Sequence, residues 1–271
     1  MPENESAPIA WEAVTPRGVA AFAQASTTRL LVVQGVVALA VALTVAWFLF
    51  GAWCPVIRQG IQHLPDEGEI RAGQLVWHGS APRLLASGSF IAFSVDLDHA
   101  GEIRSPAHLE VEFGRETFLI HSLLGYLELR YPSGWIVEFN REQLAPWWGA
   151  WQPMILGLVA LGVIGQLLVT WALLAALYAL PLWVLVFLLD RPLRIIACWR
   201  MAGAALLPGA LAMIVGLVLY GFGVVDLVGL GFITAGHFVL GWIYLFVGSL
   251  FLPRATPPDA SPKNPFARPP A

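Results

Sequence analysis

The sequence predicts a polytopic α-helical membrane protein, with about four transmembrane helices and one small β-rich extracytoplasmic domain between the first and second helices. Of its 271 residues, 58% are hydrophobic and only 12% are charged. A soluble domain carries about 25% charged residues. This composition excludes an ordinary soluble enzyme and a disordered chain. The formal net charge of −3 also excludes a basic nucleic-acid-binding surface, so no nucleic acid is expected as a partner.

Four long apolar stretches predict the spans, because about 20 apolar residues cross a bilayer. Three of them, residues 30–53, 201–222 and 227–252, each fit one helix. The remaining stretch, residues 151–189, is too long for one span and contains Pro181, a residue that disrupts helix interiors. We predict a span over about 151–180, followed by an interfacial segment over 181–199. The alternative, two spans within 151–189, stays open.

The positions of Lys and Arg predict the orientation, because bases near span ends stay in the cytoplasm. They form three groups: before the first span, between the second and third, and after the last. These are Arg17 and Arg29, then Arg191, Arg194 and Arg200, then Arg254, Lys263 and Arg268. Four spans place all three groups in the cytoplasm. Segment 1–29 and the proline-rich tail 253–271, predicted to be disordered, are then cytoplasmic, and residues 54–149 lie outside.

The preference for arginine over lysine indicates the source of the protein. Lys263 is the only lysine, and a high ratio of arginine to lysine is typical of GC-rich bacterial genomes. We therefore expect a multi-pass protein of the bacterial inner membrane. The bilayer is one expected partner. Another membrane or extracytoplasmic protein is the second.

The polar segment 54–149 predicts strands, because apolar and polar residues alternate in 91–97 and 108–113. Such alternation indicates one buried face and one solvated face. The solvated face is the candidate interaction surface, and it carries Asp96, Asp98, His108, Glu110 and Glu112. Residues 127–131 and 135–139 flank Pro132-Ser133-Gly134 and predict a hairpin.

Motifs for chemistry are missing from the sequence. Asp96 and Asp98 superficially resemble the start of a calcium loop, but Ala100 stands where the loop needs a third oxygen ligand. Cys54 and Cys198 lack the spacing of a metal site or redox pair. No phosphate-binding glycine loop or nucleophile elbow is present. We therefore expect no catalytic residue, cofactor or metal, and a protein that is not an enzyme.

The candidate polar residues within the predicted spans are His237, Gln166 and Gln34. An ionisable residue inside a membrane span is rare and often functional. His237 is therefore expected either to form an interhelical hydrogen bond or to belong to a proton or ligand site. At the cytoplasmic side, Arg191, Arg194 and Arg200 either fix the orientation or bind anionic lipid head groups. Small residues such as Gly209 and Gly216 allow close helix contact, within the chain or with another subunit.

Three stretches of the chain resemble a bacterial family known as domain of unknown function 1189, whose members are sometimes labelled maltodextrin-utilization membrane proteins. They are Leu64-Pro65 with 70–75, Phe93-Ser94-Val95-Asp96 leading to Gly101, and 192–197 leading to Leu206-Leu207-Pro208. The last stretch is also similar to the membrane domain of Yip-type proteins. The resemblance implies this topology and no established catalytic residues.

Two functions follow as expectations. The first is a non-enzymatic inner-membrane protein whose extracytoplasmic β domain binds a partner or ligand while the helical bundle anchors and associates. The alternative is a transporter subunit or small solute carrier, with Pro181 and Pro208 as helix breaks and His237 near the path.

Overall fold

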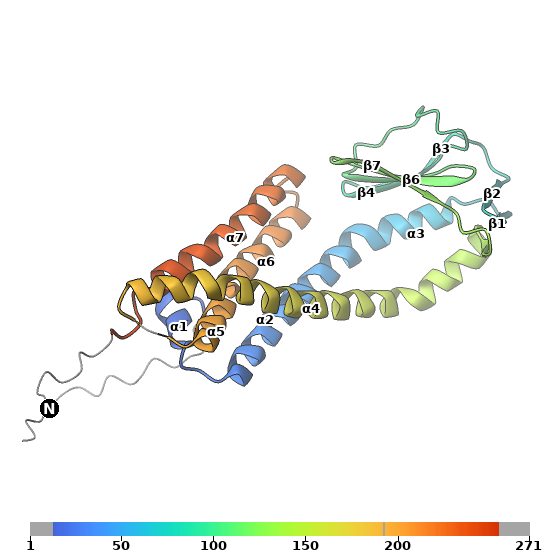
Figure 1. Ribbon diagram of the computed structural model, residues 1–271. Coiled ribbons are helices and arrows are strands. Elements are labelled where there is room, and N and C mark those ends of the chain that lie inside the picture. The colour runs from blue at the N-terminus through green and yellow to red at the C-terminus, as the bar shows by residue number, and fades with distance from the viewer. Residues whose placement is uncertain (1–12, 192, 255–271) are drawn as a thin grey trace, which may run out of the picture. The chain divides into compact units, whose positions relative to one another are not determined.

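A computed structural model describes residues 13–191 and 193–254 (Figure 1). It contains four helices long and apolar enough to cross a membrane, with a small β-sheet region between the first and second. These helices cover Thr27–Gln62, Arg141–Leu188, Ile195–Gly221 and Leu227–Ser249. By length and composition they confirm the coarse architecture predicted from the sequence. Of the predicted tail 253–271, the residues after Arg254 lie outside the described residues.

The first long helix continues past Trp53, where the predicted span ends. It consists of α2 (Thr27–Phe48), one π-helical turn (Leu49–Trp53) and α3 (Cys54–Gln62). Pro55 explains the wider turn, because a proline has no N–H to donate to the preceding turn. The helix then leads directly into the β region.

The second long helix, α4 (Arg141–Leu188), runs without a break through Pro181. It begins after Asn140, whose side-chain oxygen accepts a hydrogen bond of 3.0 Å from the Gln143 N–H. One helix therefore occupies the stretch for which the sequence left one or two helices open. The segment 181–199 is divided between the last turns of α4, a short link and the start of α5.

The last helices are α5 (Ile195–Ala205), α6 (Leu207–Gly221) and α7 (Leu227–Ser249), and a short helix α1 (Pro16–Ala21) precedes α2. Pro208 lies in the first turn of α6, where its missing N–H costs little. The chain forms two compact units. A bundle unit comprises Met1–Val37, Leu167–Ala212 and Thr234–Ala271, and a sheet unit comprises Ala38–Gln166 and Met213–Ile233.

The bundle unit has an apolar core formed by α1, α2, α4, α5, α6 and α7. Its fully buried side chains include Phe22, Leu30, Leu182, Met201 and Leu245. The backbones of α6 and α7 approach closely at Gly209: a Cβ built there would lie 2.6 Å from the carbonyl oxygen of His237. Only glycine fits this contact without a shift of one helix. This stretch of small residues therefore packs within the chain.

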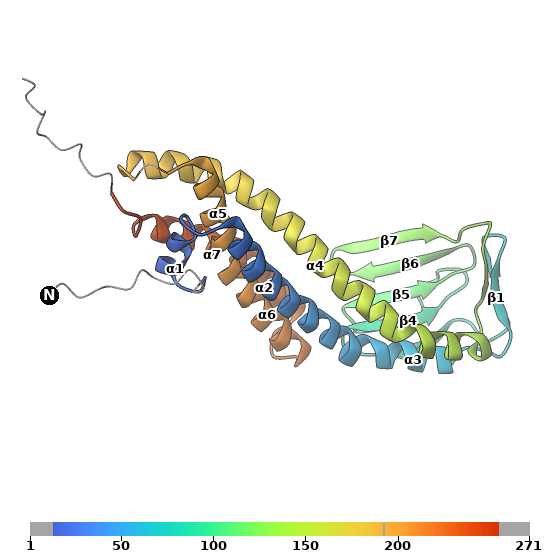
Figure 2. The ribbon, with the colours of Figure 1, turned by 90° about the horizontal axis from the view of Figure 1, so that it is seen from below.

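The sheet unit contains two sheets. The smaller has the order β2-β1-β8 and the larger the order β3-β4-β5-β6-β7. Figure 2 shows β4 to β7 side by side. All paired strands are antiparallel except β4 and β5, which are parallel. The strands are β1 (Gly68–Arg71), β2 (Gln74–Trp77), β3 (Arg83–Ser87), β4 (Ile91–Val95), β5 (Leu109–Phe113), β6 (Thr117–Ser122), β7 (Gly125–Arg130) and β8 (Ile136–Glu138).

The predicted hairpin over 127–139 is wrong, because β7 and β8 belong to different sheets. Tyr131 explains the break between them. Its ring is buried in the core of the sheet unit, and its hydroxyl donates a 3.1 Å hydrogen bond to the Gly114 carbonyl. The chain therefore turns inward after β7, and β8 pairs with β1 instead.

The larger sheet is covered on both faces around β4 and β5, whereas all residues of β7 are exposed. Helix α3 and the first turns of α4 lie against one face, where Val56 and Leu144 join the apolar core (Figure 2). The segment 96–108, which connects the parallel strands β4 and β5, makes hydrogen bonds to side chains of the opposite face. The prediction of a solvated polar face is therefore wrong for Asp96, Glu110 and Glu112, which are buried. The connection between two parallel strands must cross the sheet, and here it covers that face.

Replacing Tyr131 with phenylalanine tests the packing beneath β7. Loss of the hydrogen bond to Gly114 should lower the free energy of unfolding by about 1 kcal/mol. Burial raises the pKa of the Tyr131 phenol, so its contribution is present below the ordinary value of about 10 and is lost as the pH rises beyond it. Thermal melting from pH 7 to 11 should show a smaller alkaline decrease in the variant. Tyr126→Phe, at an exposed position on β7, is the control. Equal alkaline decreases in wild type and Tyr131→Phe would contradict the prediction.

Candidate functional site

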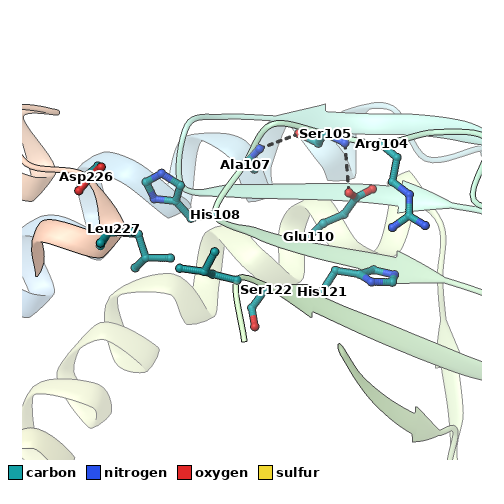
Figure 3. A pocket seen from close by; sticks show the side chains of 11 residues that line it. Arg104, Ser105, Ala107, His108, Glu110, His121, Ser122, Asp226 and Leu227 are labelled. Carbon is teal, nitrogen blue, oxygen red and sulfur yellow. Dashed lines mark hydrogen bonds between the residues drawn. The ribbon is translucent and has the colours of Figure 1, made fainter. Parts of the chain in front are cut away.

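A pocket of about 400 Å³ opens within the sheet unit, at one end of β5 and β6 (Figure 3). Residues of the 96–108 connection, of the two strands and of the turn before α7 line it. They are Arg104, Ser105, Ala107, His108, Glu110, His121, Ser122, Leu123, Asp226, Leu227 and Val228. We call it the polar pocket. Its volume lies within the range of about 300–1,000 Å³ that small-molecule sites occupy.

Glu110 holds the 96–108 connection against the sheet. Its side chain is buried, and each carboxylate oxygen accepts one hydrogen bond, at 2.9 Å from the Ser94 hydroxyl and at 3.1 Å from the Ser105 N–H. The Ser105 side chain in turn bonds to the Ser87 hydroxyl at 2.7 Å. A buried carboxylate needs such donors because its desolvation is costly. The result is that Arg104, the residue before Ser105, is held beside the pocket.

Glu112 lies between two histidines on the same face. Its side chain is 3% exposed, and its carboxylate is 2.5 Å from His99 Nδ1 and 3.6 Å from His121 Nε2. The other nitrogen of His99 is 3.0 Å from the Thr117 hydroxyl. His121 Nε2 is buried and has no hydrogen-bond partner among the described residues, and the His121 ring lines the pocket. The Glu112 carboxylate therefore lies between the two imidazoles, bonded to His99 and close to His121.

Asp96 and Asp98, at the start of the 96–108 connection, differ in burial. Asp96 is buried, and its carboxylate accepts a 2.9 Å hydrogen bond from the Gly101 N–H, which stabilises the turn after β4. Asp98 is 82% exposed and lies 3.6 Å from Arg115. The structure therefore brings Asp96, Glu110 and Glu112 together beneath one segment and leaves Asp98 at the surface.

His108 is fixed by an aromatic cluster at the entrance to β5. Its Nδ1 is 2.6 Å from the Tyr220 hydroxyl, and the two rings stack at 5.5 Å. Phe90 packs against both rings, and Phe48 packs against Phe90 and Tyr220. Nδ1 of His108 is thus bonded to Tyr220, which leaves Nε2 as the nitrogen that can form a hydrogen bond beside the pocket. Figure 3 shows His108 near Asp226, with Arg104, Glu110 and His121 further along the sheet.

The remaining wall is apolar. Leu123, Leu227 and Val228 supply it, and Asp226 caps α7 by accepting a 2.7 Å hydrogen bond from the Gly229 N–H. The pocket therefore combines a polar side, with one arginine and two imidazoles, and an apolar side. Among residues 13–191 and 193–254, no group of three His, Cys, Asp or Glu side chains is placed to hold a metal ion. The arrangement is suited to binding through hydrogen bonds and apolar contact.

The polar residues predicted within the spans separate in the structure. Gln34 is buried in the bundle unit and donates a 3.3 Å hydrogen bond to the Gly203 carbonyl of another helix. The ring of His237 bonds to the Thr234 carbonyl of its own helix. Gln166 lies on α4 in the sheet unit. A proton or ligand role for His237 stays a prediction.

Two of the three predicted lipid-binding arginines bond within the chain. Arg191 donates to the carbonyls of Ser249, Leu250 and Leu252, and so satisfies the C-terminal end of α7. Arg200 donates a 2.7 Å hydrogen bond to the Ala23 carbonyl. Arg194 precedes α5 and is exposed, so only this residue has its side chain turned to the surroundings.

Several pocket residues were missed from the sequence. Arg104 and Ser105 lie in a connection without motif or periodicity. Tyr220, which bonds to the pocket residue His108, lies near the end of a predicted span. Their grouping depends on the parallel pairing of β4 and β5, which no local pattern signals. The sequence did indicate His108 and Glu110 as candidate site residues.

Comparison with protein-family models, with curated proteins and with solved structures finds no match to this chain. The resemblance to domain of unknown function 1189 therefore stays a prediction.

Proposed function

We propose that this protein is a non-enzymatic protein of the bacterial inner membrane whose extracytoplasmic β domain binds a ligand in the polar pocket, while its helical bundle anchors it. The observation that carries the proposal is the pocket of about 400 Å³. Buried carboxylates position its polar wall from behind, and a preformed site of this kind binds without a large ordering cost.

The polar network supports binding rather than local stability alone. Buried carboxylates are costly to desolvate, and apolar side chains of similar volume are often at least as stabilising. Here Glu110 bonds to Ser105 and so holds the residue pair Arg104-Ser105, and the Glu112 carboxylate lies 3.6 Å from Nε2 of His121. Polar groups arranged behind a cavity are typical of binding sites.

The proposal is tested by filling the pocket. Ala107→Trp places an indole in the pocket, whereas Ala100→Trp, an exposed position on the same connection, leaves it open. We expect mass spectrometry of extracts from purified protein to show a small molecule in wild type and Ala100→Trp that is absent from Ala107→Trp. Identical extracts from all three proteins would contradict the proposal.

The proposed sidedness has its own test. Cys54 and Cys198 are both buried, so cysteines introduced into a Cys54→Ala/Cys198→Ala background are needed. Leu124→Cys, at a side chain 98% exposed, should react with a membrane-impermeant maleimide on intact spheroplasts. Pro258→Cys in the tail should react only after permeabilisation. Labelling of Pro258→Cys from outside would overturn the four-span orientation.

A further inference from the structure

We propose that the ligand of the polar pocket is an amphiphile with an anionic phosphate head group, whose phosphate binds at Arg104 and whose apolar part leaves along Leu123 and Val228. The inference rests on the proposed function and adds the class of ligand. It depends on the charges that remain available in the pocket, on the apolar rim, and on the position of the pocket at the ends of two candidate spans.

Arg104 supplies the one positively charged side chain in the lining of the polar pocket, whereas the carboxylates of Glu110 and Asp226 are bonded to donors of the chain itself. Glu110 already accepts from Ser94 and Ser105, and one oxygen of Asp226 caps α7. The exposed guanidinium of Arg104, in contrast, pairs with no carboxylate among the residues that the structure describes. Arginine presents several N–H groups in a planar fork that matches phosphate oxygens, and such charge-assisted bonds are among the strongest in proteins.

The rim of the pocket is apolar to an unusual degree for a domain in water. Leu123 is 65% exposed and the adjacent Leu124 is 98% exposed, both in the turn between β6 and β7. Val228, on the first turn of α7, lines the same pocket and is 51% exposed. Clustered exposed apolar side chains mark sites that contact a protein, a membrane or an apolar ligand.

The position of the pocket favours a lipid as the source of these contacts. Leu227 and Val228, which line the pocket, are the first residues of the candidate span Leu227–Ser249, and the preceding candidate span ends at Gly221. The ends of spans lie at the water–bilayer boundary, where lipid phosphates are found. A lipid there would place its phosphate in the polar half and its chains beside the apolar rim.

Binding of phosphatidylglycerol to the delipidated full-length protein in a neutral detergent tests the inference. Wild type should bind phosphatidylglycerol and should not bind diacylglycerol with the same chains, which lacks the phosphate. Arg104→Gln should weaken binding about tenfold, which is the loss of one charge-assisted hydrogen bond. Arg130→Gln, on β7 at the strand end opposite the pocket, should bind like wild type. Each melting temperature is measured to confirm folding.

Two further measurements separate the possible sources of the phosphate. Leu123→Gln should weaken phosphatidylglycerol binding and leave any binding of glycerol 3-phosphate unchanged. If glycerol 3-phosphate binds wild type as tightly as the lipid does, the ligand is a soluble phosphate ester and the proposal of an amphiphilic ligand is wrong. If Arg104→Gln and Arg130→Gln bind the lipid equally, the phosphate site itself is overturned. The extract comparison with Ala107→Trp still decides the proposed function in either case.

Discussion

Replacing Gly209 with alanine is expected to destabilise the full-length protein more than any other single-methyl addition to its helices. The new Cβ would lie 2.6 Å from the carbonyl oxygen of His237 and 3.4 Å from its carbonyl carbon. Because these atoms belong to the backbone of α7, no side chain can move aside, and the two helices must separate. Overpacking of this kind lowers the free energy of unfolding by about 1–3 kcal/mol. Because the contact here is with backbone atoms, we expect a decrease near the upper end of that range.

A second glycine on the same pair of helices supplies the control. A Cβ at Gly236 meets no atom within 4 Å. Alanine is the better helix former by about 1 kcal/mol, so Gly236→Ala should leave the melting temperature unchanged or raise it. The opposite signs of the two changes, measured by thermal unfolding in the same detergent, are the result to look for. An increase for Gly209→Ala would mean that α6 and α7 do not approach as the structure has them.

Hydropathy predicts the long helices of this chain well, because the apolar length that crosses a bilayer is a property of the local sequence. The same reasoning failed at the ends of the helices. Trp53 looked like a boundary, yet the helix continues through Pro55 to Gln62, since α3 gains apolar contacts with the sheet. Packing between segments that are distant in the sequence decides where such helices end, and a local sequence pattern carries no information about that packing.

The candidate site was predictable only in part for a related reason. Alternation along 108–113 correctly predicted a strand and placed Glu110 and Glu112 together on one face. It could not indicate which face is solvated, because β4 and β5 pair in parallel and their connection returns across the polar face. The histidines that approach Glu112 come from the connection and from β6, and only the paired strands reveal that they meet.

Replacing Glu112 with glutamine should give the second large effect. The carboxylate is buried between His99 and His121, so the substitution removes a negative charge that two imidazoles approach. Glutamine keeps the size of the side chain, and it offers a single acceptor oxygen beside an amide that donates. Hydrogen bonds to charged groups contribute about 1.5–3 kcal/mol, and we expect a decrease of about 2 kcal/mol in the free energy of unfolding. Glu128→Gln, on the exposed strand β7, should change it by less than about 0.5 kcal/mol.

A double-mutant cycle with His99→Gln separates the interaction from general damage. If the 2.5 Å contact between His99 and Glu112 carries the effect, the double variant should be more stable than the sum of the single losses predicts, by about 1 kcal/mol or more. Denaturant unfolding of the four proteins in one detergent measures the cycle. Strict additivity would mean that the two side chains do not interact, and the network behind the polar pocket would then lose its central member. Because the same carboxylate faces His121, coupled loss of ligand in the Glu112→Gln extract would tie this network to binding as well as to folding.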